Sequence, residues 1–280
     1  MENKIILSLK GHDKNIPMVR YFINDKDKNE YLISADFDYR IIVWDISNNY
    51  NIKYNFLSSY NGNIYSCLLV FPSNIPNNYL IISTRAIVYK DHDDQYTKLY
   101  NLESGSLIKN FNNTNNIRIF YLISWYNKIN KEYYIIQFGA EIILINSLSS
   151  DDCFSLESED KNTYFRGFVY EKNDIDYLCS SSMYGSINIW DLSKKKLFKV
   201  ISSFEDELWH IIQWNDKYSI VADRINKSFK IIDMENYKII SNFSGEHEET
   251  VLCVKKIYHP IYGESLLSFA EDKTIKLWTT

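Results

Sequence analysis

The residue types best suited to chemistry in this sequence are histidine, serine and aspartate, which recur together at matched spacings near its two ends. The two sets are His12, Ser34 and Asp38, and His247, Ser268 and Asp272. A histidine beside an aspartate could act as a general acid–base pair. A single active site would not be repeated in one chain. We therefore interpret both sets as structural, held by hydrogen bonds whose loss would cost about 1 to 3 kcal/mol per orphaned group.

A tryptophan follows each set, six residues after the aspartate and ten after the serine. It recurs as Trp-Asp at residues 44–45 and 190–191 and as Trp-Thr at 278–279, and weaker copies can be placed between these. The six positions are Trp44, Tyr100, Ile145, Trp190, Ile232 and Trp278, with spacings of 56, 45, 45, 42 and 46 residues. A period of roughly 40 to 45 residues built from four short strands is typical of a propeller blade, whereas helical repeats would have a 3.6-residue rhythm.

The first copy contains the strands of one such blade. A first apolar run extends from Ile16 to Phe22, and a second contains Leu32 before a turn at residues 36–38. A third run contains Ile41, and a fourth spans 52–57. With its glycine-histidine turn, turn aspartate and closing Trp-Asp, this copy resembles the WD-repeat β-propeller family.

The resemblance implies a buried chain of hydrogen bonds within each well-formed blade, running from the tryptophan indole N–H through serine and histidine to aspartate. Its members would be His12, Ser34, Asp38 and Trp44 in the first blade, and His247, Ser268, Asp272 and Trp278 in the last. The four copies between them keep only parts of this pattern. We expect apolar packing to hold those blades together.

We therefore expect one all-β domain over residues 1–280, a WD-repeat β-propeller of six blades with four antiparallel strands each. The expected blades are 10–59, 60–112, 113–159, 160–203, 204–244, and 245–280 completed by 3–9. The last copy ends after its third strand, while Lys4–Leu9 alternates as a strand does, so the N-terminal strand is predicted to pair with the C-terminal blade. In the alternative, the ring is open and a partner completes it, as in coat and nuclear-pore scaffold proteins.

The repeat register also predicts which side chains lie on the top face around the central channel, where the resemblance places binding of peptides and proteins. Arg118 and Arg166 fall on equivalent positions of adjacent blades. The aromatic residues predicted around them are Phe37, Tyr65, Phe138, Tyr164 and Trp209. Arginine with tyrosine and tryptophan is typical of interface hot spots, and paired arginines can bind a carboxylate or phosphate. In the alternative, the arginines form internal salt bridges and the aromatics fill the channel.

Composition narrows the function further. The 36 acidic side chains exceed the 31 basic ones, for a formal charge of −5, so neither nucleic acid nor a membrane is an expected partner. The N-terminal apolar run is too short for a signal peptide or a membrane span, which predicts a cytoplasmic or nuclear protein. The four cysteines are scattered, and Lys90–Asp94 is interpreted as a solvated hairpin tip of a blade-two insertion. Neither a metal nor a cofactor is therefore expected.

The predicted function is a non-catalytic scaffold that binds a peptide or protein, with an acidic or phosphorylated peptide as the expected ligand class, and that is monomeric alone or a subunit of a complex. The first alternative is the open propeller of a coat or pore assembly. A phosphoinositide-binding propeller is disfavoured, because the motif of such proteins is Phe-Arg-Arg-Gly and Phe165-Arg166-Gly167 has one arginine.

Overall fold

The computed structural model describes most of the chain as antiparallel β-sheets. The described residues are 8–16, 18–24, 28–36, 40–57, 62–70, 79–86, 96–112, 119–158, 162–202, 204, 207–224 and 226–279; side chains are not described at 62–70, 79–86, 96 and 112. The chain divides into two compact units, Met1–Ser124 and Trp125–Thr280. The prediction of one domain over residues 1–280 stays a prediction.

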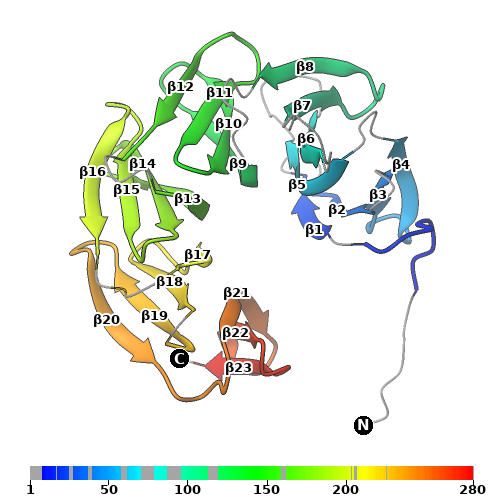
Figure 1. Cartoon of the computed structure of the whole chain (residues 1–280). Coiled ribbons are helices and arrows are strands. Elements are labelled where there is room, and N and C mark those ends of the chain that lie inside the picture. The colour runs from blue at the N-terminus through cyan, green and yellow to red at the C-terminus, as the bar shows by residue number, and fades with distance from the viewer. Residues whose placement is uncertain are drawn as a thin grey trace. The chain divides into compact units, whose positions relative to one another are not determined.

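Eight strands form two four-stranded sheets in the first unit, and in each sheet the strands follow chain order (Figure 1). The first sheet contains β1 (Met18–Ile23), β2 (Glu30–Ala35), β3 (Arg40–Asp45) and β4 (Asn51–Leu57). The second contains β5 (Gly62–Val70), β6 (Tyr79–Ala86), β7 (Tyr96–Asn101) and β8 (Leu107–Asn112). Every pairing is antiparallel, which gives each sheet the up-and-down meander of a propeller blade.

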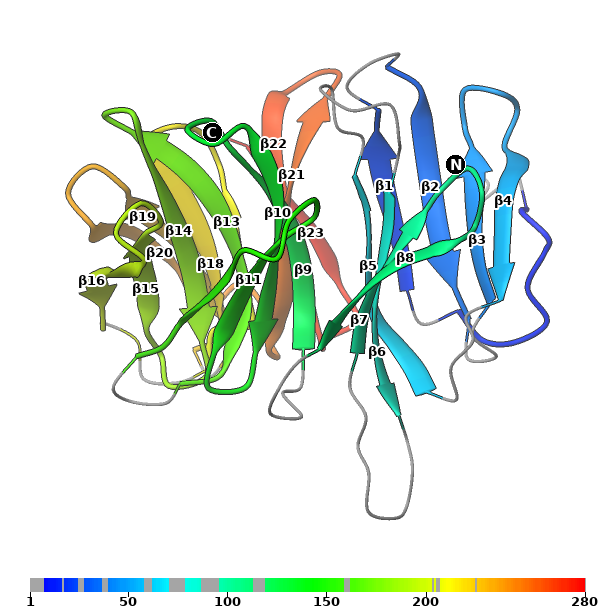
Figure 2. The ribbon, with the colours of Figure 1, turned by 90° about the horizontal axis from the view of Figure 1, so that it is seen from above.

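The sheets that follow repeat this meander, as the strands running up and down side by side in Figure 2 illustrate. The third contains β9 (Ile119–Asn127), β10 (Glu132–Gly139), β11 (Ile143–Ser147) and β12 (Cys153–Leu156), and the fourth β13 (Tyr164–Lys172), β14 (Ile175–Ser182), β15 (Ile187–Asp191) and β16 (Lys196–Ile201). The fifth contains β17 (His210–Gln213), β18 (Tyr218–Asp223), β19 (Ser228–Asp233) and β20 (Lys238–Phe243), and the last β21 (Val251–His259), β22 (Gly263–Ala270) and β23 (Ile275–Thr279). Strand β9 crosses the boundary between the two units.

The prediction of an all-β chain of propeller blades is confirmed, but the predicted blade count is wrong. Five sheets have four strands, and the sixth, β21–β23, has three among the described residues. The strand predicted to complete it was Lys4–Leu9. Residues 1–7 lie outside the described part of the chain, and Ser8 and Leu9 belong to no strand.

Burial along the strands explains why these residues form sheets. The central strands β2 and β3 are buried on both faces, and at Ile33, Ile41 and Val43 the exposed fraction is zero. The outer strand β4 instead alternates between exposed and half-buried side chains. Branched aliphatic residues fit the two-sided positions, while alternation marks a strand with one solvated face.

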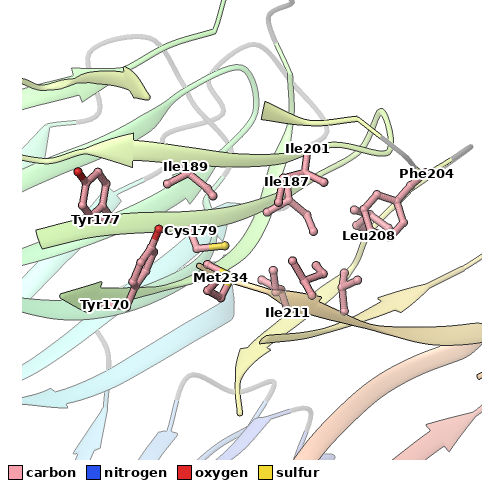
Figure 3. Packing of buried hydrophobic residues seen from close by; sticks show 12 residues of the cluster. Tyr170, Tyr177, Cys179, Ile187, Ile189, Ile201, Phe204, Leu208, Ile211 and Met234 are labelled. Atoms are coloured by element: carbon pink, nitrogen blue, oxygen red, sulfur yellow. The ribbon is translucent and has the colours of Figure 1, made fainter. Parts of the chain in front are cut away.

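The second unit has its own apolar core between the fourth and fifth sheets. The cluster contains Ile187 and Ile189 of β15 together with Leu208, from the segment before β17, and Ile211 of β17; in Figure 3, Ile187 lies between Ile189 and Leu208. Cys179 of β14 is fully buried in the same cluster, and this burial raises the pKa of its thiol. The cluster joins two successive blades, as propeller packing requires.

The repeated tryptophan donates a hydrogen bond to a serine ten residues earlier in three of the sheets. The indole Nε1 to serine Oγ distances are 2.8 Å for Trp44 and Ser34, 2.9 Å for Trp190 and Ser180, and 2.7 Å for Trp278 and Ser268. These bonds tie the third strand of each sheet to the second. The fourth sheet therefore keeps this half of the network, although the sequence had indicated that apolar packing mainly holds it.

Histidine extends the network in the first and last sheets. His247 contacts Ser268 Oγ through Nε2 at 2.7 Å and Asp272 Oδ2 through Nδ1 at 2.8 Å. Hydrogen bonds from Thr274 first, and from His247, hold the pKa of Asp272 well below its usual range. His12 makes the equivalent contact with Ser34 at 2.7 Å.

In the first sheet the carboxylate that completes this network is Asp36. Its Oδ2 lies 2.6 Å from His12 Nδ1, and its other oxygen accepts the backbone N–H of Arg40. Asp38, which the sequence predicted for this role, lies outside the described residues. Asp36 and His12 are almost fully buried, so this pair has no access to a substrate.

The aspartate after the repeated hydrophobic position shapes the turn that follows. Asp191 Oδ1 accepts the backbone N–H of Lys194 at 3.0 Å, and Asp233 Oδ1 accepts that of Glu235 at 2.8 Å. Asp45 accepts from Asn48 in the same way, at 3.1 Å. Aspartate favours such turns because its side chain can hydrogen-bond the backbone two or three residues on. The Trp-Asp recurrence is thus explained by two separate structural roles.

Gly167 of β13 lies where a side chain cannot be accommodated. A Cβ atom at this position would lie 2.2 Å from the carbonyl oxygen of Cys179 and 2.7 Å from the Phe138 ring. We expect Gly167→Ala to lower the free energy of unfolding by about 1 to 3 kcal/mol, because backbone or ring must move. Urea denaturation measures this. Gly263→Ala is the comparison. An added Cβ there meets no other atom, but alanine is strained at the φ of 72° that this glycine adopts. If both substitutions lowered the free energy of unfolding equally, the loss at Gly167 would not come from packing.

Candidate functional site

Some predicted top-face residues are interior side chains in the structure. Tyr164 has no exposed surface; its hydroxyl donates to Ser158 Oγ at 2.8 Å, and its ring packs edge-on against Trp190. Phe138 is also fully buried, with its ring over Gly167. The prediction that these two aromatics contact a ligand is therefore wrong.

A β-bulge explains the error at Tyr164. Strand β13 pairs Tyr164 with Ser182 and Arg166 with Ser181, so Phe165 is an extra residue without a partner in β14. An extra residue reverses which side chains face the interior, and bulges often redirect side chains near sites. Phe165 and Arg166 are half-buried, while Tyr164 before them is fully buried.

Other predicted site residues lie outside the described part of the chain. These are Phe37, Arg118 and the side chain of Tyr65, together with the insertion residues Lys90–Asp94. Of the predicted ligand contacts, the described and partly exposed ones are Arg166 and Trp209.

Arg166 makes an internal contact with a buried histidine. Its Nη1 donates to Nε2 of His210 at 2.5 Å, across the start of two inner strands, β13 and β17. Burial, and then the positive charge of Arg166, lowers the pKa of His210 to about 3, so the imidazole is neutral and can accept this hydrogen bond. This contact agrees with the alternative in which the arginine is held within the blades.

The pKa of His210 predicts a stability loss in mild acid. Its folded pKa of about 3 lies below the ordinary value of 6.5, so between these values the unfolded chain binds the proton and the folded one does not. Stability is therefore complete above pH 6.5 and falls as the pH drops toward 3. Between pH 7 and pH 5 we expect the wild type to lose about 2 kcal/mol more than His210→Gln in urea denaturation. Equal losses in the two proteins would contradict the buried neutral imidazole.

The side chain of Trp209 is held in place by two charged neighbours, Glu207 and Arg224. Its indole Nε1 donates to Glu207 Oε2 at 2.6 Å, and the guanidinium of Arg224 lies 4.6 Å from the ring centroid. Arg224 Nη1 also donates to the same Glu207 oxygen at 2.5 Å. One carboxylate thus holds both an indole and a guanidinium that stack on each other.

Further aromatic surface adjoins this group. Phe165 lies 6.2 Å from Trp209 between ring centroids. The turn after β14 is tied to the same region, because Leu208 N–H donates to the Ser182 carbonyl at 3.0 Å. Tyr184 in this turn is 68 % exposed. We call Phe165, Tyr184, Glu207, Trp209 and Arg224 the aromatic–arginine patch.

The patch has the chemistry of a recognition surface. The Trp209 ring is large and held by two contacts, so a partner can bury it with little loss of side-chain entropy. Arg224 has N–H donors besides the one directed at Glu207, and no described residue engages them. Such donors can bind a carboxylate or phosphate. Of this patch the sequence indicated Trp209; Phe165 lies at a bulge, and Arg224 and Tyr184 lie in turns.

The described residues contain neither a group of side chains suited to a metal ion nor a helix suited to a membrane. No group of three His, Cys, Asp and Glu side chains there could hold a metal ion. No described helix is long and apolar enough to cross a membrane. The described cysteines, Cys153, Cys179 and Cys253, are free thiols.

Comparison with known proteins does not name a family. Neither a protein-family model nor a curated protein matches this chain.

Proposed function

We propose that this chain is a WD-repeat β-propeller that acts as a non-catalytic interaction scaffold in the cytoplasm or nucleus, binding a peptide or protein at the aromatic–arginine patch. The observation that carries the proposal is Trp209, a half-buried indole held between Arg224 and Glu207 at one end of the sheets. Tryptophan and arginine are the residues most enriched at the energetic centres of protein interfaces.

An acidic or phosphorylated residue is the proposed feature of the ligand. The N–H donors of Arg224 that are not bonded to Glu207 support this assignment, as does the positive charge of Arg166, the residue after Phe165 on β13. A catalytic role is not proposed, because His12 and His247 are buried and bonded to serine and aspartate on both ring nitrogens.

Affinity capture tests the proposed function. The purified chain serves as bait in an extract of its native organism, beside a matched Trp209→Ala/Arg224→Ala bait, and recovered proteins are identified. A partner recovered by the first bait and absent from the second supports the proposal. The same partners on both baits would place binding elsewhere, and a partner motif without acidic or phosphorylated residues would remove the proposed ligand class.

A second candidate is a propeller completed by another strand, supplied by Lys4–Leu9 or by a partner in a coat or pore assembly. Strand β23 supports it, because it pairs with β22 alone among the described strands and exposes Ile275 and Leu277. Beside it lies an apolar cavity of about 440 Å³ in the second unit, lined in part by Phe229, Phe243 and Trp278. An added apolar strand would cover this edge and the cavity.

Deleting Met1–Leu9 distinguishes a strand supplied by this chain from a strand supplied by a partner. If Lys4–Leu9 completes the sixth sheet, we expect the deletion to lower Tm by about 10 °C, since several apolar side chains lose their burial. Differential scanning calorimetry measures this, with Lys4→Ala/Ser8→Ala as the control because those residues alternate with the apolar positions. An unchanged Tm would contradict self-completion, and a stoichiometric partner that raises Tm would indicate the open scaffold.

A further inference from the structure

A second pocket lies at the other end of β13 from the aromatic–arginine patch. Phe165 and Glu171 are six residues apart on this strand, which corresponds to about 20 Å. The pocket has a volume of about 410 Å³, within the range of roughly 300 to 1,000 Å³ that is typical of ligand sites. It lies in the second unit, where the end of β9 and the turn between β13 and β14 meet.

Three large apolar side chains form part of the pocket wall. Trp125, which is almost fully buried, forms part of the lining, and Ile175 adds to it. Ile129, in the turn after β9, also lines the pocket although 85 % of it is exposed. That turn is pre-organised, because the Asn127 side chain accepts the backbone N–H of Ile129 at 2.9 Å. A large apolar side chain held this openly at a pocket rim is suited to cover a bound group.

The charge in the pocket is unbalanced. Glu171, Asp174 and Asp176 contribute three carboxylates, and Lys128 is the one basic side chain in the lining. Lys128 forms an ion pair with Glu171. The pKa of Lys128 is raised first by its hydrogen bond to Glu171 and also by the charges of Asp176 and Asp174, so the site attracts positive charge.

The carboxylates are placed differently around the opening. Asp176 Oδ2 accepts the Trp125 indole N–H at 2.8 Å, which fixes it on the aromatic wall. Asp174 is exposed in the turn after β13, where its φ is 60°, and it forms no ion pair with any described residue. A cation that entered the pocket would therefore meet an exposed carboxylate, Asp174, and a second one, Asp176, that is held by the indole.

We propose that this pocket binds an arginine side chain presented by a peptide segment of a partner protein. Arginine fits because its planar guanidinium can pair with two carboxylates at once while its methylene groups lie against Ile129 and Ile175. A lysine would supply a single point charge. The site is separate from the aromatic–arginine patch, so it would give the scaffold a second point of attachment with opposite charge preference.

Fluorescence polarisation tests this with two labelled octapeptides, one alternating arginine with alanine and one with citrulline in place of arginine. We expect the arginine peptide to bind at low salt and the citrulline peptide to bind at least about tenfold more weakly. In Glu171→Gln/Asp174→Asn, affinity for the arginine peptide should fall about tenfold. In Lys128→Gln it should rise about threefold, because the competing ammonium is gone.

The matched control is Glu141→Gln/Asp216→Asn, which removes the same charge at exposed positions outside the pocket. Its affinity should equal that of the wild type. The proposal is overturned if the arginine peptide does not bind, if the control weakens binding as much as the pocket variant, or if Lys128→Gln weakens it. Trp209→Ala should leave this binding unchanged, which separates the pocket from the patch.

Discussion

His247→Ala is expected to lower the free energy of unfolding by about 2 to 4 kcal/mol. The imidazole is 3 % exposed and contacts Ser268, Asp272 and Thr274, so its removal leaves buried polar atoms without a partner as well as a cavity. Urea denaturation followed by tryptophan fluorescence measures the change.

Glu246→Ala is the control for this substitution. Glu246 precedes His247 in the chain and its side chain is exposed, so we expect a change within about 0.5 kcal/mol. If His247→Ala matched this small effect, the hydrogen bonds of His247 with Ser268 and Asp272 would not be what holds the last sheet. Ser193→Ala removes a hydroxyl that bonds Asp191 in a turn. If His247→Ala lowers the free energy of unfolding more than Ser193→Ala does, the histidine network contributes more to stability than this turn hydrogen bond.

Trp209→Ala is expected to weaken partner binding by about 30- to 1,000-fold, the range of an interface hot spot of roughly 2 to 4 kcal/mol. The substitution removes the ring on which Arg224 stacks and the N–H that Glu207 accepts. Isothermal titration with the captured partner measures the affinity. Because Trp209 is half-buried at the edge of the core, Tm should fall by only a few degrees.

Arg224→Lys separates charge from geometry at the same patch. Lysine keeps the positive charge but cannot donate bidentately to a carboxylate or phosphate, so we expect a loss of about tenfold. Lys227→Ala is the control, since Lys227 lies three residues on, with its ammonium directed at the Glu248 carbonyl and the Glu249 side chain. Unchanged affinity in both Trp209→Ala and Arg224→Lys would exclude the patch as the binding surface.

The sequence predicted the sheets well because their determinants are local and repeated. Each blade carries its own apolar alternation, and the tryptophan-to-serine spacing is the same in Trp44, Trp190 and Trp278. The sequence pattern did not show that Asp36 is the aspartate that bonds His12. The spacing to Ser34 and Trp44 favoured Asp38, because it equals the spacing around Asp272 in the last sheet, whereas the carboxylate that reaches His12 is that of Asp36.

The candidate site was harder to predict for physical reasons. The bulge at Phe165 adds one residue to β13, and a one-residue slip moved Tyr164 from an expected surface position to the core. Glu207 and Arg224 are 17 residues apart in different turns, so their ion pair depends on how β17 and β18 are joined. Trp209 was predictable because it directly follows the buried Leu208 and directly precedes a regular strand.

The central claim is that the aromatic–arginine patch is where this propeller binds its partner, and hydrogen–deuterium exchange of the complex tests it most directly. We predict slower exchange at the backbone amides of residues 162–166, 182–186 and 207–210 when the partner is bound. The turns at 128–131 and 173–174, which follow β9 and β13, are followed separately, because a partner that also presents an arginine to the acidic pocket would protect them as well. Protection confined to those turns, or to β23, with no change around Trp209, would contradict the account.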